Sequence, residues 1–127
     1  MNLLLDTHIF LWYISGDQKL SNKTKDTISD PANQVYLSVV SVWETIVKYR
    51  LGKLPLPQAQ ETYLPEQRAR HQISSLSLDE ESVRQLGQLP PLHRDPFDRM
   101  LICQAIEHKL VLVTEDPAIR AYSVSLL

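Results

Sequence analysis

Short apolar runs recur along the chain, separated by longer segments of mixed polarity. Residues 2–5 and Val111–Val113 are almost wholly apolar, as is typical of strands buried on both faces of a parallel sheet. Gln34–Val40 is rich in Val, Leu and Tyr, and in Gln72–Leu78 apolar residues alternate with serines, so both segments are also predicted to be strands. Ser123–Ser125 is a candidate edge strand.

The segments between these runs carry helix start and stop signals. A polar capping residue opens each of them, and a glycine, a proline or a basic residue closes most of them. The predicted helices are Thr7–Ser15 before Gly16, Ser21–Asp30 before Pro31, Ser41–Gly52, Gln58–Arg70 with an interruption or kink at Pro65, Asp79–Gly87, Asp95–Lys109 and a single turn opened by Thr114–Pro117. Leu54–Pro57 is expected to be a rigid linker and Leu89–Leu92 a loop, and no role is assigned to residues 58–70.

This order of elements determines the expected fold class. Strands that alternate with helices predict an α/β protein, here a three-layer α/β/α sandwich around a parallel sheet of four to five strands with right-handed connections. With 127 residues, 43% of them apolar and 22% charged, the chain has the length and composition of one globular domain, residues 1–127.

The composition also limits the cellular setting and the partners. Cys103 is the single cysteine, so no disulfide framework can form within the chain and a reducing cytoplasm is expected. The N-terminus lacks the basic region of a signal peptide, and no run approaches the roughly 20 apolar residues that span a membrane. A net charge of −2 argues against a protein that holds nucleic acid by overall basicity, but it does not exclude an enzyme that touches nucleic acid locally.

Four acids occur at junctions between strands and helices. Asp6 follows the first strand, Glu44 follows the second, Asp98 lies in the first turn of the most apolar helix, and Asp116 follows the last central strand. In an open parallel sheet the carboxyl ends of the strands face a common crevice, so these carboxylates can converge.

Each of these acids also has a structural explanation. Asp6, Asp95 and Asp116 stand where N-cap residues belong, whereas Glu44 and Asp98 occupy the third helical position, Glu44 in a capping box with Ser41. Capping does not require carboxylates, because Ser, Thr and Asn cap about as well as Asp. The repeated choice of acids therefore favours a shared chemical role.

A cluster of like charges is unfavourable unless a cation neutralises it. An all-carboxylate site with open water positions suits Mg²⁺ or Mn²⁺, whereas the lack of clustered Cys and His argues against zinc. One or two such ions can activate water and offset charge on a phosphate, so the acids point to phosphate chemistry.

Several motifs together resemble the PIN-domain family, in particular its VapC toxins, over nearly the whole chain. The residues that carry the resemblance are Leu-Leu-Leu-Asp6-Thr7, Ser-Val-Trp-Glu44, His93-Arg-Asp-Pro-Phe-Asp98-Arg99 with the following Leu-Ile-Cys-Gln-Ala, and Val-Thr114-Glu-Asp116. The resemblance implies a PIN-like fold and a ribonuclease toxin that cuts single-stranded regions of RNA, forms a homodimer and is inhibited by a cognate VapB-like antitoxin.

By the same resemblance, Asp6, Glu44, Asp98 and Asp116 are the expected catalytic acids, with Asp6, Asp98 and Asp116 as ligands of Mg²⁺ or Mn²⁺. Supporting roles fall to Thr7 and Thr114, which would supply hydroxyls, and to Asp95. Asp95 and Asp98 compete for the third acidic position, and Asp98 is favoured because it directly precedes the Met-Leu-Ile-Cys-Gln-Ala run.

The other candidate residues receive ordinary structural interpretations. Trp12, Trp43 and Tyr49 lie on apolar stretches and are predicted to be core or dimer-interface residues rather than platforms for RNA bases. His8 and His93 are expected to flank the crevice.

Two other classes of protein remain as alternatives. One is another acid-and-Mg²⁺ phosphoryl-transfer domain, such as a receiver or a haloacid-dehalogenase-like phosphatase, although Asp6-Thr7-His8 lacks the paired acids that those classes need. The other is a non-catalytic PIN-like interaction module in which the acids serve only as caps.

Overall fold

The structure, a computed structural model, describes residues 1–54 and 60–127. Its centre is a sheet of four strands, β1 (Asn2–Leu5), β2 (Gln34–Ser38), β3 (Ser74–Leu76) and β4 (Val111–Val113). The strands lie in the order β3-β2-β1-β4 and every pairing is parallel. The most central strand, β1, is also the most apolar, because three of its four residues are leucines with no exposed surface.

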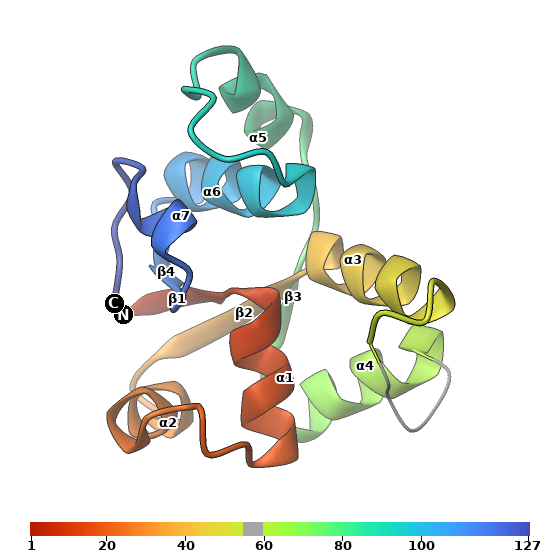
Figure 1. Cartoon of the computed structure of the whole chain (residues 1–127). Helices are drawn as coiled ribbons and strands as arrows, with labels where there is room; N and C mark the ends of the chain where they lie inside the picture. Colours follow the sequence, from red (N-terminus) through yellow and green to blue (C-terminus); the bar gives the residue numbers. More distant parts are fainter. Residues whose placement is uncertain (55–59) are drawn as a thin grey trace.

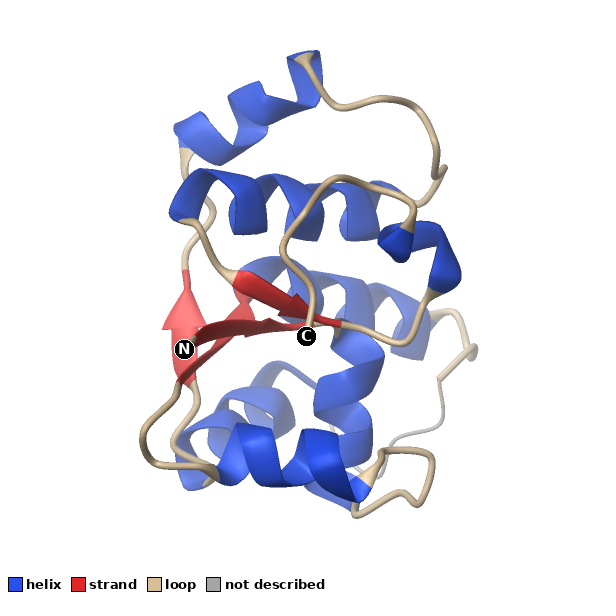
Figure 2. Cartoon of the chain, turned by 90° about the vertical axis from the view of Figure 1, so that its left-hand side faces the viewer, coloured by secondary structure: helices blue, strands red, loops and turns tan. Residues whose placement is uncertain are grey.

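Helices cover both faces of this sheet, as Figure 2 shows in the side view. In Figure 1, α1, α2 and α4 lie on one side of the sheet and α5, α6 and α7 on the other. The next helix after β2, α3, packs against α1, α4 and α6. Their bounds are α1 (Thr7–Ser15), α2 (Asn22–Ser29), α3 (Val39–Arg50), α4 (Gln60–Arg70), α5 (Glu80–Arg84) followed by a 3₁₀ turn at Gln85–Gly87, α6 (Pro96–His108) and α7 (Pro117–Arg120).

The strand residues alternate between two hydrophobic clusters, one on each face of the sheet. Leu3 and Leu5 join the cluster beneath α1, α2 and α4, whereas Leu4 joins the cluster beneath α6 and α7. Cys103 is fully buried on α6, as expected for a small apolar residue of the core. The predicted α/β/α sandwich with a parallel sheet of four to five strands is therefore confirmed.

The sequence-based prediction of the junction between β2 and α3 is wrong by two residues for the end of the strand and by three for the N-cap. The strand ends at Ser38 instead of Val40, and Ser38 rather than Ser41 is the N-cap, with its hydroxyl accepting a hydrogen bond from the Val40 amide. The helix starts early because Ser38 satisfies a free amide at that point, so the β-branched Val39 and Val40 are helical. Glu44 is consequently the sixth residue of α3 and takes no part in a capping box.

Three further predictions need correction. The described helix α4 continues through Pro65, so the interruption is absent, whereas a kink at Pro65 stays a prediction. Residues 55–59, which include most of the predicted linker and the start of the predicted helix, lie outside the described residues. The third strand is shorter than predicted, and Gln72 before it adopts a left-handed φ of 58°. Ser123–Ser125 forms no strand, and the isolated parallel bridge to Leu112 is made by the next residue, Leu126.

Candidate active site

One open cleft of about 350 Å³ lies where β1 and β4 end and α3 and α6 approach them. All four acids predicted to be catalytic, together with Asp95, line this cleft. The complete lining is Asp6, His8, Ile9, Trp12, Glu44, Lys48, His93, Asp95, Asp98, Glu115 and Asp116. Carboxylates that are as far as 110 residues apart in sequence are thus gathered at one edge of the sheet, as expected for ligand sites in open α/β folds.

Asp6 links the end of β1 to the end of β4. The residue is 5% exposed, and its carboxylate accepts a hydrogen bond of 2.8 Å from the hydroxyl of Thr114, which is also buried. Asp6 has the backbone position of the N-cap of α1, but its side chain makes no capping hydrogen bond. Burial raises the pKa of Asp6 above its ordinary value, although the Thr114 hydroxyl and the nearby His8 oppose the shift.

Glu44 is 2% exposed on the second turn of α3. The Thr7 hydroxyl donates to Glu44 Oε1 at 2.7 Å and also lies 2.9 Å from the Ser41 hydroxyl. Lys48, one turn further along α3, forms an ion pair with Glu44 Oε2. Burial works against the charge of Lys48, but the pairing with Glu44, together with the charges of Asp95 and Asp98, outweighs it and raises the pKa of the lysine.

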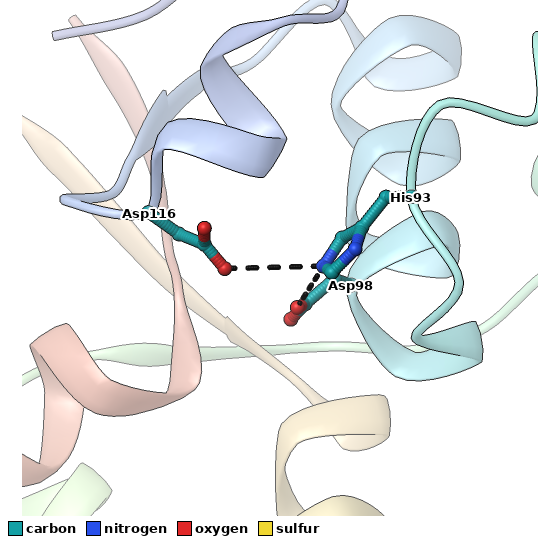
Figure 3. A group of neighbouring side chains, drawn as sticks. All are labelled: His93, Asp98 and Asp116. Carbon is teal, nitrogen blue, oxygen red and sulfur yellow. Dashed lines mark hydrogen bonds and ion pairs between the residues drawn. The ribbon is translucent and has the colours of Figure 1, made fainter.

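Asp98 stands at the third position of α6 and interacts with His93 from the preceding loop. Figure 3 shows one ring nitrogen of His93 facing two carboxylates, with Nε2 2.8 Å from Asp98 Oδ2 and 3.8 Å from Asp116 Oδ2. Burial is the main cause that raises the pKa of Asp98 to about 7, and the carboxylates of Asp6, Asp95 and Glu44 add to the shift despite the His93 hydrogen bond. The cleft therefore disfavours full ionisation of its acids.

Asp95 and Asp116 are true N-caps. Asp95 accepts hydrogen bonds from the amides of Phe97 and Asp98 at 2.8 and 3.2 Å, and Asp116 accepts one from Ala118 at 2.9 Å. In both residues the bonded atom is Oδ1, so the second oxygen is left for other contacts, such as that of Asp116 Oδ2 with His93. Asp95 and Asp116 can therefore each cap a helix and line the cleft at the same time.

Two sets of side chains in the described part of the chain bring possible metal-ligand atoms within 4.8 Å of one another. One set is His93, Asp98 and Asp116, and the other is Glu44, Asp95 and Asp98. Asp98 belongs to both sets, whereas Asp6, whose carboxylate accepts the hydrogen bond from Thr114, belongs to neither. The geometry thus favours Asp98 as the centre of the cluster and gives Asp95 a place beside it.

The model of the PIN domain family matches residues 3–124 of the chain. The chain belongs to the PIN-domain family. Ribonuclease VapC16 of Mycobacterium tuberculosis is 41% identical to this PIN domain over 58 residues, a match that spans 46% of this chain and 41% of that relative.

Solved structures share the fold of this PIN domain at low sequence identity. VapBC2 from Rickettsia felis, bound to a DNA fragment from its promoter, superposes with a TM-score of 0.74 at 16% identity and covers 100% of this chain and 98% of its own. VapBC-1 from nontypeable Haemophilus influenzae gives 0.69 at 18% identity, with 100% and 97% covered. DNA-bound VapBC from Salmonella typhimurium gives 0.67 at 18% identity, also with 100% and 97% covered.

The donor set of this PIN domain fits a hard divalent cation. Six carboxylates line the cleft, and Lys48 is the single lysine or arginine among the described lining residues. Oxygen ligands of this kind suit Mg²⁺ and Mn²⁺. Burial is the main cause of the raised pKa values of Asp6 and Asp98, and a bound cation would offset the repulsion between carboxylates that adds to it.

The role of His93 was underestimated from the sequence. Both His8 and His93 line the cleft as predicted, but the contact of His93 with two acids was not foreseen. Its position two residues before a capping Asp was the available signal, although a loop carries no periodicity that would orient the ring. Trp43, predicted to be a core or interface residue, is not in the core of this chain, because 57% of it is exposed.

Proposed function

We propose that the chain is a metal-dependent endoribonuclease that hydrolyses RNA phosphodiester bonds and acts as the toxin of a VapBC-type toxin–antitoxin pair. The observation that carries the proposal is the gathering of Asp6, Glu44, Asp98 and Asp116 around one cleft. Membership of the PIN-domain family and the partial match to a protein named as a ribonuclease support it.

Asp6, Asp98 and Asp116 are the proposed ligands of Mg²⁺ or Mn²⁺, with Glu44 completing the site. Asp95 and His93 are close enough to Asp98 to contribute to the same site. When bound, such an ion lowers the pKa of a coordinated water and offsets charge that develops on the phosphate.

The remaining chemistry falls to groups of the chain itself. In the proposed reaction the oxygen of water forms a bond to phosphorus, the bond from phosphorus to the 3′ oxygen breaks, and that oxygen takes up a proton. The products are a 5′-phosphate and a 3′-hydroxyl. Thr114 and Thr7 keep Asp6 and Glu44 oriented through their hydroxyls, and Lys48 holds the second oxygen of Glu44.

The proposed partners are an RNA substrate, a VapB-like antitoxin and a second copy of the chain in a homodimer. The structures with the same fold are described as VapBC complexes, which supports the antitoxin as a partner. In the described part of the chain no helix is long and apolar enough to cross a bilayer.

The test is cleavage of single-stranded RNA by the purified chain with and without Mg²⁺. We expect Asp98→Asn to abolish cleavage while its circular dichroism spectrum stays that of the wild type, because Asn keeps the size of the side chain and removes its charge. Asp26→Asn is the matched control, because Asp26 is exposed on α2 and does not line the cleft. Asp6→Asn should behave as Asp98→Asn does.

Cleavage by Asp98→Asn and Asp6→Asn at the rate of the wild type would contradict the proposal. It would favour the alternative of a non-catalytic interaction module, for which the capping hydrogen bonds of Asp95 and Asp116 are the supporting observation. Mapping the 5′ ends of cellular RNA after expression, with and without the antitoxin, would identify the substrate.

A further inference from the structure

The cleft has an aromatic side that the proposed hydrolysis does not use. His8 and Trp12 lie one turn apart on α1 and both line the cleft, with their ring centroids 6.2 Å apart. The acids Asp98 and Asp116 come from α6 and the turn before α7, which Figure 1 places on the other face of the sheet from α1. The cleft therefore runs between an aromatic side and an acidic side.

Trp12 packs against the core on one side. It is half-buried and contacts the hydrophobic cluster beneath α1, α2 and α4, which restricts the position of the indole. The ammonium group of Lys19 lies over the Trp12 ring, 5.9 Å from its centroid. A second ammonium group, that of Lys48, lines the same cleft and is paired with Glu44.

These groups match the parts of a nucleotide. We propose that Trp12 is the platform on which a base of single-stranded RNA stacks when the neighbouring phosphate lies at the acids, an inference that rests on the proposed nuclease function. An aromatic face binds any base by stacking, and nearby cations attract the backbone phosphates. A volume of about 350 Å³ is at the small end of ligand pockets, so the cleft accommodates a nucleotide-sized group.

The chain contains a matched control for this assignment. It has two tryptophans, and Trp43 is more exposed than Trp12 but does not line the cleft. Trp43 instead makes an edge-to-face contact with Phe97, with ring centroids 4.8 Å apart. General attraction of RNA to exposed tryptophan would therefore involve Trp43 at least as much as Trp12.

The experiment measures equilibrium binding of two synthetic octamers in Ca²⁺ buffer, an oligoadenylate and an abasic ribose-phosphate chain of the same length. We expect Trp12→Leu to weaken binding of the oligoadenylate roughly tenfold, because the base loses the aromatic face on which it stacks. Binding of the abasic chain should not change, since it has the same charge but nothing to stack. Trp12→Phe should retain most of the affinity, and Trp43→Leu should retain all of it.

Fluorescence gives an independent measurement. In a Trp43→Phe background Trp12 is the remaining tryptophan, and its emission should be quenched saturably by the oligoadenylate. Three results would overturn the inference: no binding of the oligoadenylate by the wild type, unchanged affinity in Trp12→Leu, or an equal loss for the two octamers. Binding is scored apart from cleavage, so a protein that stacks bases on Trp12 but cleaves no RNA would contradict the proposed function alone.

Discussion

Asp98 combines burial with the proximity of several other acids. Its side chain belongs to both groups of possible ligands, and its pKa is raised to about 7 from an ordinary value of 3.8. Between pH 3.8 and about 7, the Asp98 carboxyl is largely protonated in the folded state and largely ionised in the unfolded chain. The folded state therefore binds more protons, and the stability of the fold falls as the pH rises through that range. In the absence of metal, Asp98 is therefore a destabilising residue above pH 7.

We expect Asp98→Asn to be more stable than the wild type in metal-free buffer at pH 8. The gain should be on the order of a few kcal/mol, because one unit of pKa corresponds to about 1.4 kcal/mol. It should shrink as the pH is lowered toward 4, where Asp98 is protonated in the folded wild type and carries no charge. Urea unfolding of both proteins in EDTA across this pH range measures the difference, and a variant that is less stable at pH 8 would contradict the argument.

The sequence predicts which acids lie at the candidate site, but not all of the contacts made there. Asp6, Glu44, Asp98 and Asp116 were located because acids near strand ends of a parallel sheet share an edge whatever the details of the loops. The contact of His93 with Asp98 and Asp116 depends on how the loop before α6 folds back, which no local pattern encodes. For the same reason the sequence did not reveal that Trp12 faces the cleft and Trp43 does not.

At the scale of elements, Ser38 connects strand β2 to the helix that follows it, α3, and to a helix distant in the sequence, α6. Its hydroxyl caps α3 through the Val40 amide and donates to Oε1 of Gln104 on α6, and both side chains are fully buried. Gln104 in turn donates to the Ser77 carbonyl beyond β3. Ser38 thereby fixes the residue at which α3 starts, and with it the position of Glu44 at the cleft.

We expect Ser38→Ala to lower the free energy of unfolding by roughly 2–4 kcal/mol, because it removes a helix cap and leaves a buried amide oxygen without its donor. Ser21→Ala is the matched control, since Ser21 caps α2 through the Thr24 amide but is exposed. That change should cost only about 1 kcal/mol. Urea unfolding monitored by circular dichroism compares the two, and equal losses would show that the bond to Gln104 adds nothing.

The boundary of α3 shows why sequence patterns predict elements better than their ends. The existence of β2 and α3 followed from the apolar run and the helix stop at Gly52, whose φ of +71° confirms its position after the helix. Their junction was misplaced because Ser38 and Ser41 are both acceptable caps, and the choice between them depends on Gln104, 66 residues away in the chain. Local propensity cannot distinguish two caps that differ only in a long-range partner.

For the whole molecule, the placement of charge matters more than its total. The net charge is only −2, yet six carboxylates line one cleft with Lys48 as the accompanying lysine among its described residues. Such a concentration of like charge stores unfavourable electrostatic energy in the folded state and little in the unfolded chain, where the acids are far apart. A divalent cation should therefore bind the folded state preferentially and stabilise it.

We expect Mn²⁺ or Mg²⁺ to raise the melting temperature of the wild type by several degrees, because a ligand at 100 times its dissociation constant adds about 2.7 kcal/mol of stability. Asp98→Asn, more stable without metal, should show little further increase, since Asp98 belongs to both clustered sets of ligands. Asp26→Asn, which lies away from the cleft, should respond as the wild type does. Melting curves at increasing Mn²⁺ concentration test this, and equal increases in the wild type and in Asp98→Asn would place the cation elsewhere on the surface.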